Sequence, residues 1–266
     1  MRPYLALSLL FALSTAPALA QTQTPSPSAT PSTAQLKVII SGGFHPPYKT
    51  MLPEFERSSG ISVHTGSGAS QGSGPETIRA QLNRGVPADV LIMSKEGLTD
   101  LLQQGKVVPG SIVDLAQVPL GVSVRAGTPK PDISSPQAFA QTLLKAKLIV
   151  LPGSTSGMFL VKEVFPKLGV PASAIKQTAR GLQATALLAA GEADLAVQPT
   201  SELLGQPGIE FVGTVPSDYQ FVSVFSVGIV AGSTEVAAAQ RLITFMASEK
   251  LAPAVKAAGM EPVKAR

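Results

Sequence analysis

Segments with strand character alternate with segments of helical character along the chain, beginning at residue 36. Residues 36–41 (LKVIIS) are a short β-branched run, after which Tyr48, Leu52 and Phe55 recur at helical spacing until Gly60. The order then repeats, with strands predicted at 61–65 and 89–93 and helices at 75–84 and 95–104. Three such units in succession predict a parallel sheet with helices on its faces.

A second set of elements begins with a strand predicted at residues 118–125 (VPLGVSVR). Helices follow at 136–145, 156–168 and near 183–190, and strands at 148–151, 194–197 and 209–213. Residues 221–230 (FVSVFSVGIV) are long enough to cross back to the first set, and helices at 234–248 and 251–258 end the pattern.

Two long strands that bracket a middle segment imply two lobes joined by two hinge crossings, with a cleft between the lobes. We therefore expect an α/β fold with two lobes, each a mixed sheet flanked by helices. Lobe I takes residues 36–120 plus 229–266, and lobe II takes residues 121–228.

The first 35 residues have a different character. Met1 and Arg2 precede an apolar run over 4–13, and the small-x-small sequence at 18–20 follows, which predicts a signal peptide over 1–20 and export of the chain. The apolar run is well short of the roughly 20 residues that cross a bilayer. Residues 21–35 (QTQTPSPSATPSTAQ) offer almost nothing to bury, so we expect a disordered linker.

Composition excludes several classes of function. The chain has no Cys and two His, and it contains neither HExxH nor GxSxG, so we expect no metal site, no cofactor and no disulfide. The net charge of +4 is small and the basic residues are scattered, so we expect no nucleic-acid partner. A single Rossmann-like sheet that binds a nucleotide is the competing architecture, but neither GxGxxG nor GxxxxGK[ST] is present.

Four turns share one chemistry: SGGFH at 41–45, GSGASQGSG at 66–74, PGSTSG at 152–157 and QPTS at 198–201. Each follows a predicted strand and precedes a helix, where ligands bind in open α/β sheets and where unpaired N–H groups favour anions. Each turn taken alone is more typical of an ordinary helix cap than of a ligand site, and a flexible surface loop is an alternative for the Gly/Ser-rich turn. Two turns fall in each lobe, which favours a shared anion site in the cleft.

Six segments carry a family resemblance: SGGF at 41–44, RGVPADVLIM at 84–93, LLQQGKVVPGS at 101–111, VRAGTPKPDIS at 124–134, GEADLAVQ at 191–198 and FSVGIVAGS at 225–233. In these the chain resembles periplasmic solute-binding proteins of ABC importers, of the molybdate-binding type. The resemblance implies the type II periplasmic binding protein fold and a monomer in the periplasm. It also implies that the protein captures a small anion for the membrane subunits of an importer.

The turns and the resemblance together give the candidate ligand-binding residues. Where molybdate binders typically place a Tyr, this chain has Gln198 and Pro199, so either an inorganic oxyanion such as molybdate or an organic tricarboxylate stays open as the ligand. The candidates are Ser41, Gly42, Gly43, Phe44, Ser67, Gly68, Ser70, Thr155, Ser156, Gly157, Arg180, Gln183 and Gln198.

The segments SGGF, VRAGTPKPDIS, TAR and SELL are similar to a branch of this family that includes periplasmic aconitate isomerase. That likeness implies a tricarboxylate ligand, which Arg180 can hold as a bidentate fork. A solvated surface position for Arg180 is an equally open alternative, since most Arg side chains are exposed. It gives an alternative function, the interconversion of cis- and trans-aconitate, which needs a base and an acid to move a proton across the allylic system. His45, His64 and Glu76 are the titratable residues nearest the turns, and we expect His45 to be the catalytic residue if the protein is an isomerase.

Overall fold

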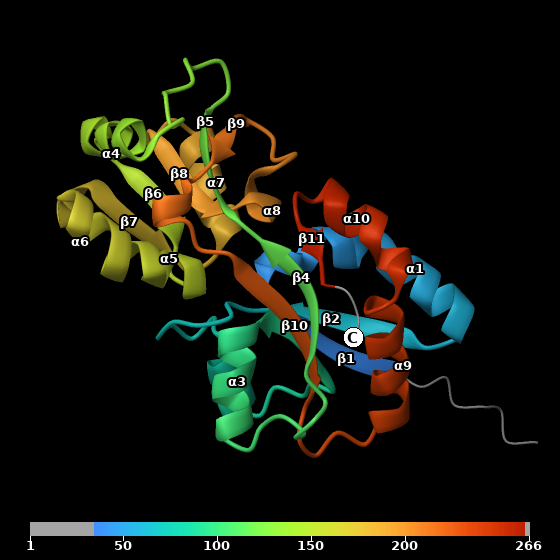
Figure 1. The fold of residues 1–266 in the computed structure, drawn as a ribbon. Helices are drawn as coiled ribbons and strands as arrows, with labels where there is room; N and C mark the ends of the chain where they lie inside the picture. Colours follow the sequence, from blue (N-terminus) through green and yellow to red (C-terminus); the bar gives the residue numbers. More distant parts are fainter. Residues whose placement is uncertain (1–34, 264–266) are drawn as a thin grey trace, which may run out of the picture. The chain divides into compact units, whose positions relative to one another are not determined.

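The computed structural model describes residues 35–263, which form two mixed β-sheets with helices on both faces of each (Figure 1). The first sheet has the order β11-β4-β10-β3-β1-β2, in which β1, β2 and β3 are parallel to one another. Strand β10 pairs antiparallel with both β3 and β4, and β11 pairs antiparallel with β4. Its strands are β1 (Gln35–Ile40), β2 (Ser62–Ser67), β3 (Val90–Ser94), β4 (Val113–Val118), β10 (Ser223–Ile229) and β11 (Glu261–Pro262).

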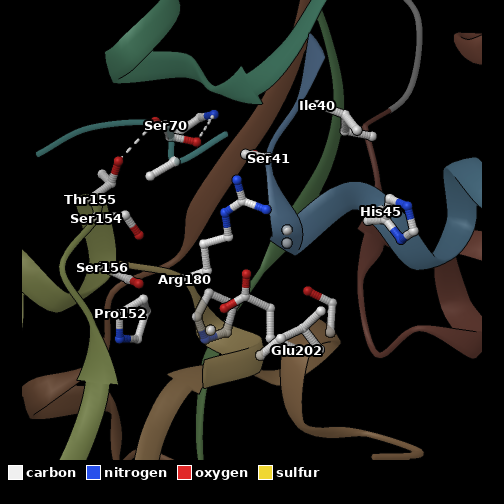
Figure 2. A pocket seen from close by; sticks show the side chains of 18 of the residues that line it. Ile40, Ser41, His45, Ser70, Pro152, Ser154, Thr155, Ser156, Arg180 and Glu202 are labelled. Carbon is white, nitrogen blue, oxygen red and sulfur yellow. Dashed lines mark hydrogen bonds between the residues drawn. The ribbon is translucent and has the colours of Figure 1, made fainter. Parts of the chain in front are cut away.

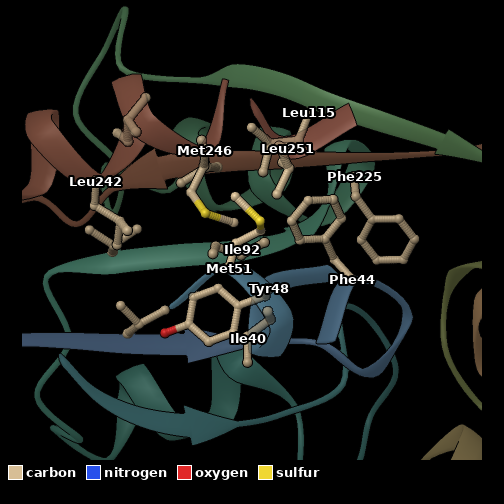
Figure 3. Packing of buried hydrophobic residues seen from close by; sticks show 14 of the residues in the cluster. Ile40, Phe44, Tyr48, Met51, Ile92, Leu115, Phe225, Leu242, Met246 and Leu251 are labelled. Carbon is tan, nitrogen blue, oxygen red and sulfur yellow. The ribbon is translucent and has the colours of Figure 1, made fainter. Parts of the chain in front are cut away.

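Two apolar layers enclose the first sheet because successive side chains of a strand point to opposite faces. Val38 and Ile40 of β1 pack into one layer and Ile39 into the other. In the first layer, Phe44 and Tyr48 meet side chains from the C-terminal helices (Figure 3). That layer is formed by α1 (His45–Ser59), α9 (Val236–Met246) and α10 (Ala252–Ala257), and the second by α2 (Ile78–Asn83) and α3 (Lys95–Gln103).

The second sheet has the order β7-β6-β8-β5-β9 and repeats this plan. Ile149 and Leu151 of β6 face one apolar layer and Val150 faces the other. The strands are β5 (Leu120–Arg125), β6 (Ile149–Pro152), β7 (Ile175–Thr178), β8 (Leu195–Pro199) and β9 (Ile209–Thr214). The helices are α4 (Pro136–Lys145), α5 (Thr155–Phe159), α6 (Phe165–Leu168), α7 (Gly181–Ala189) and α8 (Thr200–Leu203).

Two chain segments connect the sheets, and they lie side by side. Only Pro119 separates β4 from β5, whereas residues 215–222 lead from β9 back to β10. The side-chain amide of Gln220 joins the two connections: its Oε1 accepts from the Leu120 N–H at 2.6 Å, and its Nε2 donates to the Leu120 carbonyl at 3.1 Å. Nε2 also donates to the carbonyl of Val215 at 2.9 Å. One side chain therefore holds both crossings together.

The fold class expected from the sequence is confirmed, with local differences. The helix expected over 75–84 begins only at Ile78, because Ala69 and Thr77 form a β-bridge and the Thr77 side chain caps the helix. Strands β4 and β7 were not expected, and the helix expected over 156–168 contains a π-helical stretch at Leu160–Val164.

The lobe boundary expected between residues 228 and 229 falls inside β10. This strand pairs along its whole length with β3 and β4, so the chain rejoins the first sheet at Ser223. The signal peptide expected over 1–20 lies outside the described residues, as does the linker apart from Gln35, which begins β1. Within residues 35–263, no helix combines the length and apolar character needed to span a membrane.

Candidate ligand-binding site

A cavity of about 190 Å³ lies between the two sheets, with side chains from both in its wall (Figure 2). The first sheet contributes the turns after β1, β2 and β3, and the second sheet contributes those after β6, β7 and β8. Three of the four turns singled out by the sequence supply several lining residues each, and the fourth, at 198–201, supplies Pro199 and Ser201. The polar, charged and glycine residues that line it include Ser41, Gly42, Gly43, His45, Ser67, Gly68, Ser70, Ser94, Ser154, Thr155, Ser156, Arg180, Gly181, Ser201, Glu202, Gln206 and Ser223.

The turn after β1 brings backbone close to the cavity. The Ser41 N–H donates to the carbonyl of Ile92 on β3, which extends the sheet by one bond beyond β1. A Cβ at Gly43 would overlap the ring of Phe225, so only glycine fits there. The short turn Gly42–Phe44 then leads into α1, whose N-terminal end faces the cavity side of the sheet.

The Gly/Ser-rich turn after β2 is held against the protein. Ala69 and Ser70 are buried, and the Ala69 N–H donates to the carbonyl of Glu76. Ser70 Oγ accepts from the N–H of Ser94 at 3.0 Å, and Ser94 Oγ lies 2.9 Å from Thr155 Oγ1 of α5. This hydroxyl pair connects the two sheets directly at the cavity, so the alternative of a flexible surface loop does not hold for this part of the turn.

Arg180 extends from the second sheet to the first. It is the N-cap of α7, and its Nη1 donates to Ser67 Oγ at 2.8 Å while its Nη2 contacts Glu76 Oε2 at 2.5 Å. Figure 2 shows the guanidinium near Ser41, above the carboxyl of Glu202. A planar cation with several N–H donors therefore lies at the cavity, where it can meet a carboxylate.

Glu202 places a carboxyl group in the wall of this cavity. A Cβ at Gly42 would lie 2.5 Å from its Oε1, and a Cβ at Gly181 would overlap Oε2, so the carboxyl is enclosed by one glycine from each sheet. Within residues 35–263, Oε2 is buried without a hydrogen-bond partner. Burial raises the pKa of Glu202 to about 7, because the charged form loses its hydration. This group can therefore hold or release a proton near neutral pH.

Two buried hydroxyls also lack partners. Ser41 is 3% exposed and Ser201 is 1% exposed, and neither Oγ has a hydrogen-bond partner within the described part of the chain. Both line the cavity. Because buried polar groups in native proteins are nearly always bonded, these hydroxyls are available to a polar ligand.

The titratable residues expected near the site lie in different places. His45 begins α1 and lines the cavity, but in Figure 2 its ring lies at the margin, apart from the guanidinium of Arg180 and the carboxyl of Glu202. Burial, with a smaller contribution from Lys49, lowers the pKa of His45. His64 is exposed on β2 outside the cavity, and Glu76 is paired with Arg180. No cluster of His, Asp and Glu suited to a metal ion occurs among residues 35–263.

Four of the candidate residues do not line the cavity: Phe44, Gly157, Gln183 and Gln198. Phe44 is buried against Phe225, and a Cβ at Gly157 would overlap the backbone of Pro152.

The two glutamines support lining residues instead. Gln183 Oε1 accepts from the Arg180 N–H at 3.2 Å. Gln198 Nε2 donates to the Glu202 carbonyl at 3.1 Å.

Sequence reasoning missed Glu202, Ser201 as a lining hydroxyl, and Ser94. The QPTS turn was singled out, yet Glu202 follows it directly in a segment whose other residues are mostly buried. A lone acidic residue at that point was the available signal, because an unpaired carboxyl is rarely buried without a role.

Three comparisons place these features among known proteins. The family model described as bacterial extracellular solute-binding protein matches residues 36–261. An aconitate isomerase from Pseudomonas sp is 36% identical over 252 residues, which cover 94% of this chain and 95% of that relative.

Among solved structures, the periplasmic molybdate-binding protein of Azotobacter vinelandii aligns with a TM-score of 0.68 at 22% identity, over 87% of this chain and 100% of its own. The sulfate-binding protein SubI from Mycobacterium tuberculosis H37Rv also has a TM-score of 0.68, at 21% identity, over 86% of this chain and 87% of its own. At this level of identity both show a shared fold.

Proposed function

The chain belongs to the bacterial extracellular solute-binding protein family, and within it we propose that this protein is an aconitate isomerase. It takes a tricarboxylate into the cavity between its two sheets and interconverts the cis and trans isomers by moving a proton. The signal peptide expected from the sequence supports a location in the periplasm.

One observation carries the proposal: the relative that is an aconitate isomerase matches this chain over nearly the full length of both proteins. A match that covers 94% of this chain and 95% of the relative leaves only short stretches of either protein unmatched. A match over one sheet alone would support only a shared scaffold.

The cavity suits an organic anion with several carboxylates. The Arg180 guanidinium offers a bidentate contact to one of them. The N-terminal ends of α1 and α7 supply partial positive charge from opposite sheets, and the unpartnered hydroxyls of Ser41 and Ser201 supply further donors. A ligand with charged groups at more than one end can therefore engage both sheets at once.

A second candidate function is the capture of a small inorganic oxyanion for an ABC importer. The fold shared with a molybdate-binding and a sulfate-binding protein favours it. The identity of those two structures to this chain is only 22% and 21%, whereas the aconitate isomerase is 36% identical over nearly the full length of both proteins. We therefore rank transport of an oxyanion below isomerisation of a tricarboxylate.

Turnover by the purified chain tests the proposal. We expect trans-aconitate to be converted into the cis isomer, and cis into trans, as followed by the separate vinyl proton signals in NMR spectra. A thermal-shift panel of molybdate, tungstate, sulfate, citrate and both aconitates runs in parallel, since a ligand of the folded state raises the melting temperature. Stabilisation by an inorganic oxyanion, without turnover of either aconitate, would replace the isomerase with the transport function.

A further inference from the structure

We propose that Glu202 is the catalytic residue that moves the proton, taking it from one carbon of the bound carboxylate and returning it to another. This assignment rests on the proposed isomerase function and adds to it the identity of the proton carrier. It replaces His45, the residue expected from the sequence, as the first choice.

The backbone around Glu202 is fixed from three directions. The Thr200 N–H donates to the carbonyl of Pro119 at 2.9 Å, and Thr200 Oγ1 donates to the carbonyl of Gly259 at 2.8 Å. The carbonyl of Glu202 itself accepts from Gln198 Nε2. These bonds tie α8 to the first crossing, to the C-terminal segment and to β8, so the carboxyl is presented to the cavity from a rigid base.

The carboxyl group of Glu202 lies between two glycines, and its Oε2 has no hydrogen-bond partner within the described residues. Its enclosure between Gly42 and Gly181 leaves room for the carboxyl only because neither residue has a side chain. Oε2 is fully buried and accepts no hydrogen bond within residues 35–263. An unpartnered ionisable group in a cavity wall is costly for stability, and such groups are concentrated at catalytic sites.

The other titratable groups at the cavity are less suited to the task. His45, Arg180 and Glu202 are the ones in its wall within the described chain. A guanidinium stays protonated and cannot act as a base. In Figure 2 the ring of His45 lies at the margin, away from Arg180, whereas the carboxyl of Glu202 lies below the guanidinium in the same view.

The reaction balances with a single carboxyl. The carboxylate of Glu202 removes a proton from the methylene carbon of aconitate, and the electrons of that C–H bond form the new double bond to the central carbon. The π electrons of the old double bond move to its outer carbon, which takes a proton back from the now neutral Glu202, either the one removed or one that the carboxyl has exchanged with solvent. Nothing is oxidised or reduced. The allylic anion formed in between spreads onto the substrate carboxylates, which Arg180 and the helix N-termini stabilise.

The raised pKa of Glu202 predicts the pH profile of this step. A carboxylate that resists ionisation is a stronger base than an exposed one. The value of kcat/KM should fall about tenfold per pH unit below pH 7 and level off above it, following a pKa of about 7.

The charged groups on the elements packed around α8 are few. Arg180 caps α7 and His45 follows the turn Gly42–Phe44, and both face the cavity. Arg125 and Glu210 lie at the far ends of β5 and β9, where Glu210 accepts from the Gly127 N–H.

The test compares Glu202→Gln, Glu202→Asp and His45→Ala with a matched control, Glu163→Gln, whose carboxyl pairs with Lys167 on the surface. We expect Glu202→Gln to lower kcat by a factor on the order of 10² to 10⁴, the usual contribution of a general acid–base group. It should still be stabilised by trans-aconitate in a thermal-shift assay. Glu202→Asp should retain part of the activity, and the control should match the unaltered protein.

A second readout follows the proton itself. In D₂O, the unaltered protein should exchange deuterium into the methylene position of aconitate, and Glu202→Gln should lose this exchange together with turnover. Retention of full exchange and turnover by Glu202→Gln would overturn the assignment, as would their loss only in His45→Ala. Absence of turnover in the unaltered protein is a different result, which refutes the isomerase function itself.

Discussion

Arg180 of the second sheet and Glu76 of the first form an ion pair across the edge of the cavity, with Nη2 and Oε2 2.5 Å apart. The two side chains are 37% and 49% exposed, so the pair contributes at most about 1 kcal/mol to the free energy of unfolding. Its effect is positional: together with the bond to Ser67 Oγ, it holds the guanidinium at the cavity.

Replacement of this arginine should therefore affect binding more than folding. We expect Arg180→Ala to weaken binding of trans-aconitate by about 10- to 100-fold, since hydrogen bonds to charged groups contribute about 1.5–3 kcal/mol. The free energy of unfolding should change by less than about 1 kcal/mol. Calorimetric titration and urea denaturation measure the two effects. Arg79→Ala is the control, because Arg79 bonds Gly72 outside this cavity; equal losses of affinity in both variants would contradict the role given to Arg180.

Two buried serines without hydrogen-bond partners, one in the cavity and one outside it, allow an effect on ligand binding to be distinguished from an effect on stability. Ser201 lines the cavity, whereas Ser123 lies in β5 away from it, and the Oγ of each is buried without a partner in the described residues. Both Ser→Ala variants should be as stable as the unaltered protein or more so, because each removes an unpaired buried group. Ser201→Ala alone should weaken the ligand, by about 3- to 10-fold for a lost bond of about 1 kcal/mol. Equal affinity in the two variants would exclude a ligand contact at Ser201.

A side chain at residue 181 should displace the carboxyl group of Glu202 without disturbing the fold. The backbone of Gly181 is compatible with alanine, but the added methyl group would overlap Oε2 of Glu202 and displace that side chain. We expect Gly181→Ala to melt within a few degrees of the unaltered protein. Its turnover should fall at least tenfold, since an increase of about 1.4 kcal/mol in the activation free energy slows a reaction tenfold. Gly74→Ala, where a Cβ meets nothing within 4 Å, is the control. Undiminished turnover in Gly181→Ala would show that the carboxyl position is unimportant.

Burial of Glu202 makes stability depend on pH in a defined direction. Its pKa rises from 4.5 to about 7 on folding, so between these values the folded protein keeps a proton that the unfolded chain releases. The free energy of unfolding should therefore fall as the pH rises through this window, by up to ~3 kcal/mol from this group. Glu202→Gln removes this pH-dependent contribution. Measured by urea denaturation, the free energy of unfolding of Glu202→Gln relative to that of the unaltered protein should therefore be higher at pH 8 than at pH 4.5. A constant difference between the two proteins would contradict the raised pKa.

The order of strands and helices was largely predictable from the sequence, because long apolar periods such as that of α1 dictate their own structure. The missed strands show the limits of this signal. The strand β7 (IKQT) has only four residues at a sheet edge, and β4 (VDLAQV) carries Asp114 and Gln117 within it. Neither alternates cleanly between apolar and polar residues, so their strand form depends on neighbours in the sheet.

The site was predictable to a similar degree. Turns rich in Gly and Ser that follow strands lie where helix N-termini converge, and most of the expected lining residues do line the cavity. Glu202 was not found because its burial is a tertiary effect: α8 packs beneath Gly42, which lies 160 residues earlier in the chain and in the other sheet. The lone acidic residue after the QPTS turn marked the position, but no local pattern records the approach of Gly42 that buries its carboxyl.

The strand β10 lies between β3 and β4 in the first sheet, although it follows the whole second sheet in the chain. As the polypeptide is synthesised, residues 120–214 are complete as a continuous stretch before the first sheet has received its interior strand. The second sheet is thus free to fold first, whereas the first sheet cannot be completed until β10 (Ser223–Ile229) is available. A truncation before Ser223 would then leave β3 and β4 with exposed edges, which are prone to pair with other chains.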